Sequence, residues 1–208
     1  MKWLLSVFLL LPLAAQAAVV GKTVEYVAGG EKMKGYMAYD DAIKGKRPGV
    51  LVVHEWWGLN DYAKKRANML AEAGYVALAV DMYGGGKTVD NPQDAGALAG
   101  AVNKNPQLAR TRFEAAQKFL DVQPLVKRGQ IAALGYCFGG AIVLNMARIG
   151  EPLKGVVSYH GILASDVPGK PGDIKAKVRV FTGEADPMGP PEHVEAFKPT
   201  GNWCPIPA

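Results

Sequence analysis

The chain has 208 residues, of which 24 are Lys or Arg and 19 are Asp or Glu, so its formal net charge at pH 7 is +5. The basic residues are scattered in small groups without interleaved aromatic residues, which argues against a nucleic-acid-binding protein. A chain of this length accommodates a single domain with a sizeable hydrophobic core.

The first 17 residues have the pattern of a cleavable signal peptide. Lys2 precedes an apolar segment from Trp3 to Ala15, and Ala15-Gln16-Ala17 forms an A-x-A cleavage site. The apolar segment is shorter than the roughly 20 residues that a membrane-spanning helix needs. We therefore expect export to the periplasm or the medium, with no membrane attachment after cleavage. An uncleaved N-terminal anchor is the alternative.

Short segments rich in Val, Ile and Tyr alternate with helical patterns along the rest of the chain. The first two segments alternate polar and apolar residues on either side of Gly29-Gly30, which is typical of an antiparallel pair. The later ones are nearly continuous apolar runs, as expected of parallel strands covered on both faces. The predicted strands are 22–28, 33–40, 49–55, 75–83, 131–137, 155–161 and 177–186.

Helical periodicity fills the gaps between these strands. Asn60 or Asp61 is expected to cap the first helix, which ends at Gly74. The other helices are expected over 94–120, over 139–150 and from Pro191 onward. This order predicts an α/β fold, a doubly wound and mostly parallel sheet with helices on both faces. Ligands of such sheets bind outside the carboxyl ends of the strands.

Reactive side chains follow several of these strand ends, and the cysteine among them lies in a distinctive turn. Gly135-x-Cys137-x-Gly139 has the spacing of a nucleophile elbow, in which the glycines let strand and helix pass closely. A helix N-terminus lowers the pKa of a thiol, and the Phe138 amide would point at an oxyanion. The alternatives are a small buried cysteine beside a tight turn or a disulfide with Cys204.

Four segments together resemble the dienelactone hydrolase family of α/β-hydrolases. They are "VLVVHEWWGLN", "AVDMYG", "GYCFGG" and "FTGEADP", in the family's order and at about its spacing, over roughly residues 21–198. The resemblance implies the α/β-hydrolase fold and hydrolysis of small esters or lactones through a Cys-His-Asp triad and an acyl-thioester. It also implies that no metal or organic cofactor is needed. We expect a monomer whose partner is a small-molecule substrate.

The resemblance also assigns roles to individual residues. Cys137 would be the nucleophile and Asp186 the acidic member of the triad. Glu55 is similar to the family's glutamate that contacts the resting thiol and helps govern its ionisation. The amides of Trp56 and Phe138 would form the oxyanion hole. The residues expected to line the substrate pocket are Trp56, Trp57 and Tyr83.

The chain departs from the family pattern in two places. Gly85 stands where members that take a dienelactone have an arginine for the substrate carboxylate, and Lys87 is the candidate replacement. The triad histidine expected on a later loop is missing, together with a last strand and helix. We expect a hydrolase domain over 18–198 and an aberrant tail over 199–208, produced by a frameshift or truncation. A divergent tail is the alternative.

The sequence contains three histidines that could replace the missing base. His54 is expected to be a packed strand-end residue and His193 a solvated helix residue. His160 ends a strand beside the Cys137 strand or one position away, and is the candidate substitute on proximity. With an impaired base, deacylation should suffer most and an acyl-enzyme should accumulate. The remaining alternatives are a non-catalytic descendant that binds a small ligand in the same pocket and a redox protein using Cys137 and Cys204.

Overall fold

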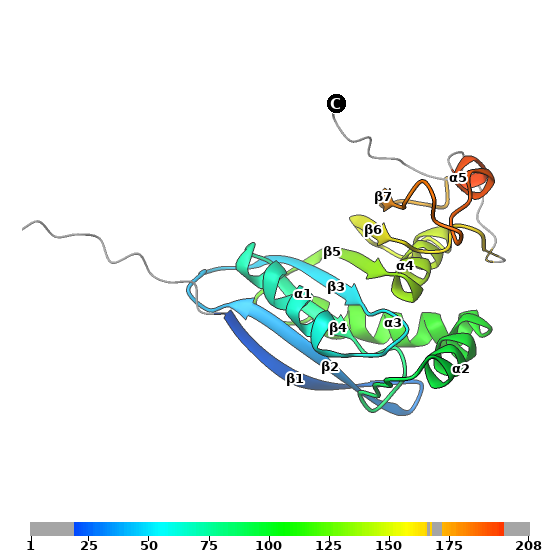
Figure 1. Cartoon of the computed structure of the whole chain (residues 1–208). Coiled ribbons are helices and arrows are strands. Elements are labelled where there is room, and N and C mark those ends of the chain that lie inside the picture. Colours follow the sequence, from blue (N-terminus) through cyan, green and yellow to red (C-terminus); the bar gives the residue numbers. More distant parts are fainter. Residues whose placement is uncertain (1–18, 166, 168–171, 198–208) are drawn as a thin grey trace, which may run out of the picture.

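The computed structural model describes residues 19–165, 167 and 172–197 (Figure 1). The predicted signal peptide over 1–17 and the tail over 199–208, with Cys204, lie outside the described residues. Within the described ranges the chain forms one sheet with the order β1-β2-β4-β3-β5-β6-β7. Its strands are β1 (Val19–Ala28), β2 (Glu31–Asp40), β3 (Arg47–Val53), β4 (Val76–Val80), β5 (Val126–Tyr136), β6 (Gly155–Tyr159) and β7 (Lys177–Phe181).

The strand directions confirm the predicted doubly wound, mostly parallel sheet. β1 pairs with β2, and β2 with β4, in antiparallel fashion, whereas β3 to β7 run parallel to one another. Each of the seven predicted strands corresponds to one of these strands. The carboxyl ends of β3 to β7 therefore gather at a single edge of the sheet, where ligands of open α/β sheets bind.

The helices are α1 (Asp61–Glu72), α2 (Pro92–Asn103), α3 (Pro106–Asp121), α4 (Phe138–Arg148) and α5 (Pro191–Phe197). Asn60 caps α1, as predicted, by accepting a hydrogen bond from the Ala63 amide. The prediction of one helix over 94–120 was wrong, because α2 and α3 are separate. Asn105 caps α3 and Pro106 occupies its first turn. A proline has no N–H to donate and disfavours helical geometry in the residue before it, so the chain breaks there.

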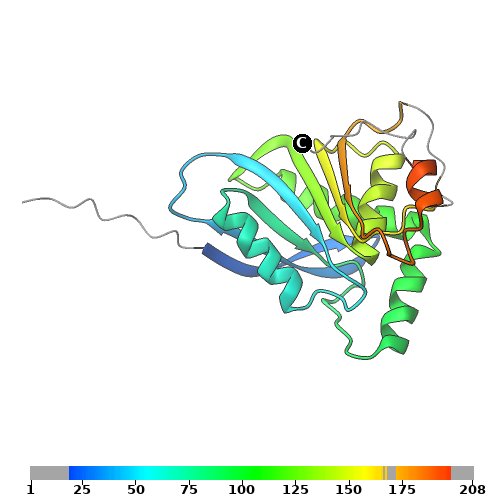
Figure 2. The ribbon, with the colours of Figure 1, turned by 45° about the horizontal axis from the view of Figure 1, so that its top comes forward.

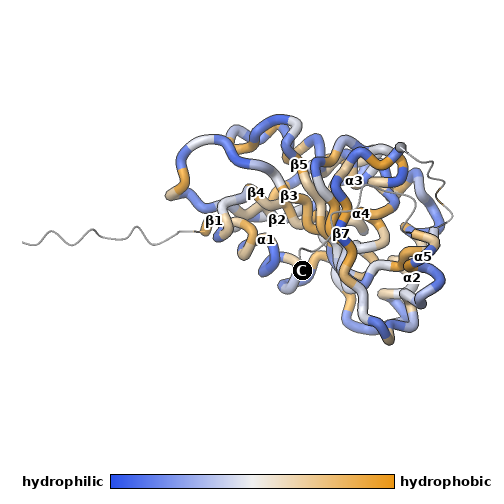
Figure 3. Tube along the Cα trace, turned by 90° about the horizontal axis from the view of Figure 1, so that it is seen from above, coloured by the Kyte–Doolittle hydropathy of each residue, from blue (hydrophilic) through white to orange (hydrophobic). Residues whose placement is uncertain are grey.

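Helices cover both faces of the sheet (Figure 2). Along β3, Leu51 and Val53 face a large apolar core with α3 and α4, whereas Val52 between them faces a smaller core with the alanines of α1. This alternation follows from the two-residue repeat of a strand. Figure 3 shows the hydrophobic residues concentrated along the central strands. In the described ranges, no helix is long and apolar enough to cross a bilayer.

Candidate active site

Cys137 lies at the sharp turn between β5 and α4, and its backbone has φ 52° and ψ −111°. Few non-glycine residues adopt such angles, which cost of order 1–3 kcal/mol and persist where the surroundings impose them. A Cβ atom on Gly135 would lie 2.1 Å from the Gly139 carbonyl oxygen, and one on Gly139 would lie 2.3 Å from the Val53 carbonyl oxygen. The predicted reason for the glycine spacing is therefore confirmed: strand and helix approach too closely for any side chain.

The ionisation of the thiol differs from the sequence-based expectation. The pKa of Cys137 is raised above its ordinary value, first because the thiol is partly buried and then because the Glu55 and Asp186 carboxylates repel the thiolate. The Phe138 N–H hydrogen-bonds the sulfur and acts in the opposite direction. The pKa is therefore raised and not lowered as predicted, because burial and the two carboxylates outweigh the hydrogen bond from the Phe138 N–H. A thiol with a raised pKa needs a base to become an efficient nucleophile.

The fold pairs His160 with Asp186. β6 lies directly beside β5, and the Cys137 amide donates to the Tyr159 carbonyl oxygen at 2.8 Å, so His160 follows the residue that touches the elbow. His160 has a φ of 56°, and its Nδ1 lies 2.5 Å from Asp186 Oδ2. The Met188 amide, and then the His160 ring, lower the pKa of Asp186.

This pairing leaves Nε2 of the His160 ring unused by Asp186, in a side chain that is 51% exposed. A histidine whose Nδ1–H is held by a carboxylate presents Nε2 as the basic nitrogen. Within the part of the chain that the structure describes, no hydrogen bond joins the His160 ring to the Cys137 thiol. Bonds of this kind are often long before substrate binds.

His54 is a packed strand-end residue, as predicted, and it has no nitrogen free to act as a base. Its side chain is 1% exposed. Nδ1 lies 2.5 Å from the Glu55 carbonyl oxygen, and Nε2 accepts from the Met82 amide at 3.3 Å. These partners assign the proton to Nδ1 in a neutral ring. Burial lowers the pKa of His54 to about 4.

This lowered pKa makes the stability of the protein depend on pH. Below the ordinary histidine pKa of 6.5, an unfolded chain binds a proton at His54 that the folded chain refuses down to about pH 4. The free energy of unfolding should therefore decrease as the pH is lowered. This residue alone should account for a loss of about 2 kcal/mol from pH 7 to pH 4.5. Urea denaturation of the wild type and of His54→Gln at both pH values checks it. An equal loss in the variant would contradict the assignment.

The predicted oxyanion and pocket residues are brought together around the elbow. The Tyr83 hydroxyl donates to the Trp56 carbonyl oxygen at 2.9 Å, and the Tyr83 and Phe138 rings lie 5.6 Å apart. The Trp57 ring lies 4.9 Å from that of Trp56. Lys87 is exposed on a loop whose Thr88 bridges to Gly58, so its substrate-binding role stays a prediction.

Asp81 has a structural role that the sequence reasoning missed. It is fully buried, and its carboxylate accepts hydrogen bonds from four backbone amides. The donors are Lys34, Tyr83, Gly84 and Gly86, at 2.7–3.0 Å. An aspartate shortly before a run of glycines is a signal for such a turn, and "DMYGGG" carries it. Asp81 therefore shapes the loop that carries Tyr83.

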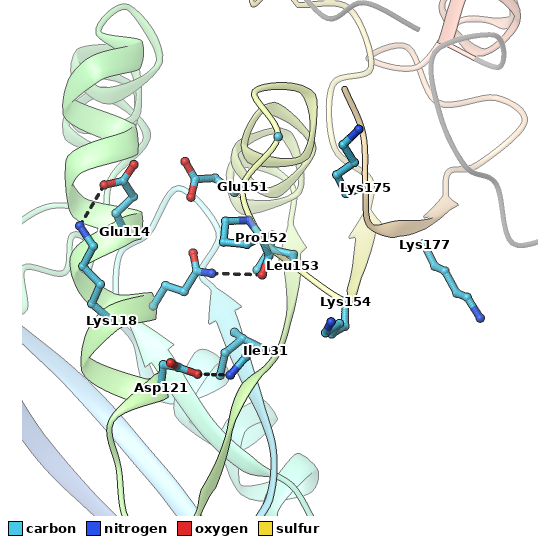
Figure 4. A pocket seen from close by; sticks show the side chains of 13 residues that line it. Glu114, Lys118, Asp121, Ile131, Glu151, Pro152, Leu153, Lys154, Lys175 and Lys177 are labelled. Atoms are coloured by element: carbon cyan, nitrogen blue, oxygen red, sulfur yellow. Dashed lines mark hydrogen bonds and ion pairs between the residues drawn. The ribbon is translucent and has the colours of Figure 1, made fainter. Parts of the chain in front are cut away.

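A groove of about 890 Å³ lies at the other end of the sheet (Figure 4). Of the residues that line it, Lys177 begins β7, Lys154 directly precedes β6, and Ile131 lies within β5, six positions before Cys137. Glu151 there is close to Arg110, at 3.1 Å, and burial raises its pKa. Among the described residues, no group of three or more His, Cys, Asp or Glu side chains is arranged to hold a metal ion.

The geometry of the elbow agrees with the comparison against known families. Residues 33–200 match the family model described as the dienelactone hydrolase family. The chain belongs to the dienelactone hydrolase family. That assignment confirms the resemblance drawn from the four sequence segments, and the sheet order and helices agree with the fold it implied.

This member of the dienelactone hydrolase family resembles several curated proteins and solved structures. It is 32% identical over 148 residues to Protein usf of Aquifex pyrophilus and to a putative carboxymethylenebutenolidase of Aquifex aeolicus. Each match covers 69% of this chain and 62% of the relative, so the chain spans about three fifths of their length. The crystal structure of the dienelactone hydrolase-like promiscuous phosphotriesterase P91 from metagenomic libraries is 35% identical. The superposition with that structure has a TM-score of 0.82. The match covers 90% of this chain and 80% of the P91 chain.

Proposed function

We propose that the protein hydrolyses small esters or lactones through a Cys137 thiolate and an acyl-thioester intermediate. The observation that carries the proposal is the elbow itself. Its φ of 52° holds Cys137 at the carboxyl edge of the sheet, with the Phe138 N–H on the sulfur. The His160–Asp186 pair next to it supports a base, and the family membership supports ester or lactone chemistry.

In the acylation step the Cys137 sulfur attacks the carbonyl carbon and the new C–S bond forms. The amides of Trp56 and Phe138 stabilise the oxyanion. His160 takes the thiol proton at Nε2 and returns it to the departing alcohol oxygen as the C–O bond breaks. Asp186 holds the Nδ1–H and stabilises the imidazolium that forms in between. For a lactone, the alcohol stays attached to the acyl group.

In the deacylation step a water molecule attacks the thioester carbonyl carbon and His160 accepts its proton. The C–S bond then breaks, the acid leaves, and His160 returns the proton to the Cys137 sulfur. This step depends entirely on the base, because water is a poorer nucleophile than a thiol. We propose that it limits turnover, because His160 is exposed and makes no hydrogen bond with the thiol in the described residues. The protein should therefore acylate faster than it releases product.

A pre-steady-state burst tests the proposed function. Mixing the protein with p-nitrophenyl acetate should release p-nitrophenol in a burst that approaches one equivalent per chain, followed by slow turnover. Mass spectrometry of the quenched protein should locate an acetyl group on the peptide that contains Cys137. Binding of the ester without any burst or acetylation would favour the non-catalytic alternative.

Substitutions of His160 and of Asp186, made one at a time, should slow deacylation more than acylation. His160→Gln removes the proton acceptor, and we expect the steady-state rate to fall by about 10²–10⁴-fold. Asp186→Asn should lower the same rate, because an amide no longer stabilises the imidazolium. Burst and steady-state phases measured for both variants separate acylation from deacylation. His193→Gln on α5 is the matched histidine control and should leave both phases unchanged.

A further inference from the structure

We infer that His54 is a positioning residue that aims the Trp56 amide into the oxyanion hole. The inference rests on the proposed function, since it concerns a donor of that reaction. It starts from one hydrogen bond: His54 Nδ1 lies 2.5 Å from the Glu55 carbonyl oxygen. That oxygen and the Trp56 N–H belong to the same peptide group.

The geometry of a peptide group makes this bond directional. The group is planar, and no cis peptide occurs among the described residues, so its C=O and N–H point in opposite directions. Fixing the Glu55 carbonyl oxygen on one side therefore fixes the direction of the Trp56 N–H on the other. The Gly58 amide also donates to this oxygen, at 3.3 Å, and limits rotation further.

The His54 ring itself has little freedom to move. Its side chain is buried, and its Nε2 accepts from the Met82 amide at 3.3 Å. The Tyr83 ring meets it edge-on, with centroids 4.8 Å apart, and the Phe138 ring stacks on it at 5.7 Å. Phe138 carries the second proposed oxyanion donor. The buried His54 ring therefore contacts Phe138 directly and is hydrogen-bonded to the peptide group that carries the Trp56 N–H.

The neighbouring peptide is fixed in a similar way. The Tyr83 hydroxyl donates to the Trp56 carbonyl oxygen at 2.9 Å. Both peptide groups of Trp56 are therefore held through their carbonyl oxygens by buried side chains. Hydrogen bonds that a carbonyl accepts also polarise its amide group, which strengthens the N–H as a donor. Such preorganised donors stabilise an oxyanion without reorganisation during the reaction.

Two reactions of the Cys137 thiol distinguish positioning of the Trp56 amide by His54 from a purely structural role of His54. Acylation by p-nitrophenyl acetate forms an oxyanion. Alkylation by iodoacetamide forms a C–S bond at a saturated carbon, expels iodide and releases the thiol proton, with no oxyanion. In His54→Phe, which keeps a ring and loses the donor, we expect acylation to slow by about 10–10²-fold. Alkylation should stay within about twofold of the wild type, since it depends on the thiolate alone.

An asparagine and glutamine pair provides a test that does not depend on the phenylalanine variant folding. The amide nitrogen of His54→Asn falls near Nδ1 and keeps a donor for the Glu55 carbonyl, so acylation should recover. The amide of His54→Gln falls near Nε2, so acylation should stay slow. His193→Gln should match the wild type in both reactions.

Each outcome decides between these ideas. Equal acylation by His54→Asn and His54→Gln, or a parallel fall of acylation and alkylation in His54→Phe, would overturn the positioning role. A wild-type protein that alkylates at Cys137 and never acylates would overturn the proposed function, and this inference with it. Slow acylation with normal alkylation in His54→Gln, restored in His54→Asn, supports the inference.

Discussion

Replacing Cys137 with alanine is expected to lower kcat/KM for ester hydrolysis by about 10⁴-fold or more, because the covalent route disappears with the thiol. The burst of p-nitrophenol should vanish as well. Cys137→Ser should also be severely impaired, since a hydroxyl is far less acidic than a thiol and depends even more on a well-placed base. Stopped-flow measurement of burst and steady state in all three proteins checks this expectation.

The fold of these variants can be judged independently of activity. Alanine at position 137 must adopt the same φ of 52°, so its free energy of unfolding should stay near that of the wild type. Cys137→Gly removes the backbone strain and should exceed Cys137→Ala in stability by about 1 kcal/mol. An alanine variant that folds normally and retains hydrolysis would show that Cys137 is not the nucleophile.

Gly139→Ala is expected to destabilise the protein by about 4 kcal/mol or more, or to prevent folding. The added Cβ would lie 2.3 Å from the Val53 carbonyl oxygen and 2.6 Å from that of His54. Both neighbours are backbone atoms of the chain leaving β3, so no rotation of a side chain relieves the overlap. α4 would have to move away from the sheet and lose its packing.

Gly96→Ala provides the matched control for this substitution. Gly96 lies within α2, and nothing stands within 4 Å of a Cβ placed there. Alanine should stabilise the helix by up to about 1 kcal/mol through its higher helix propensity. Urea denaturation of both variants measures the contrast. A Gly139→Ala variant within about 1 kcal/mol of the wild type would show that the elbow tolerates a looser approach than these distances indicate.

The sheet and its reactive edge were predictable because they depend on local pattern. Polar–apolar alternation located the first two described strands and apolar runs located the others, and the parallel order then placed Cys137, His160 and Asp186 at one edge. The sequence predicted that His160 would be near the thiol, and the structure adds its contact with Asp186. That contact joins residues 26 positions apart in the chain, and periodicity gives no signal for a pairing at that separation.

The features that sequence reasoning missed are hydrogen bonds between segments far apart in the chain. His54 binds the Met82 amide, and the Asp81 carboxylate binds the Lys34 amide, across strands that are neighbours only in space. The raised pKa of Cys137 has a similar origin, because it sums burial with charges carried by two other strand ends. Propensity and periodicity report on neighbours in sequence, so they carry no information about such contacts.

The buried carboxylate of Asp81 has a mechanical consequence for the pocket. It ties the loop after β4 to the Lys34 amide in β2, and so to the first hairpin of the sheet. The wall that carries Tyr83 is therefore an extension of the sheet rather than a hinged flap. For the proposed reaction, we therefore expect selectivity on this side of the thiol to come from complementarity with a preformed surface and not from closure of the loop over the substrate.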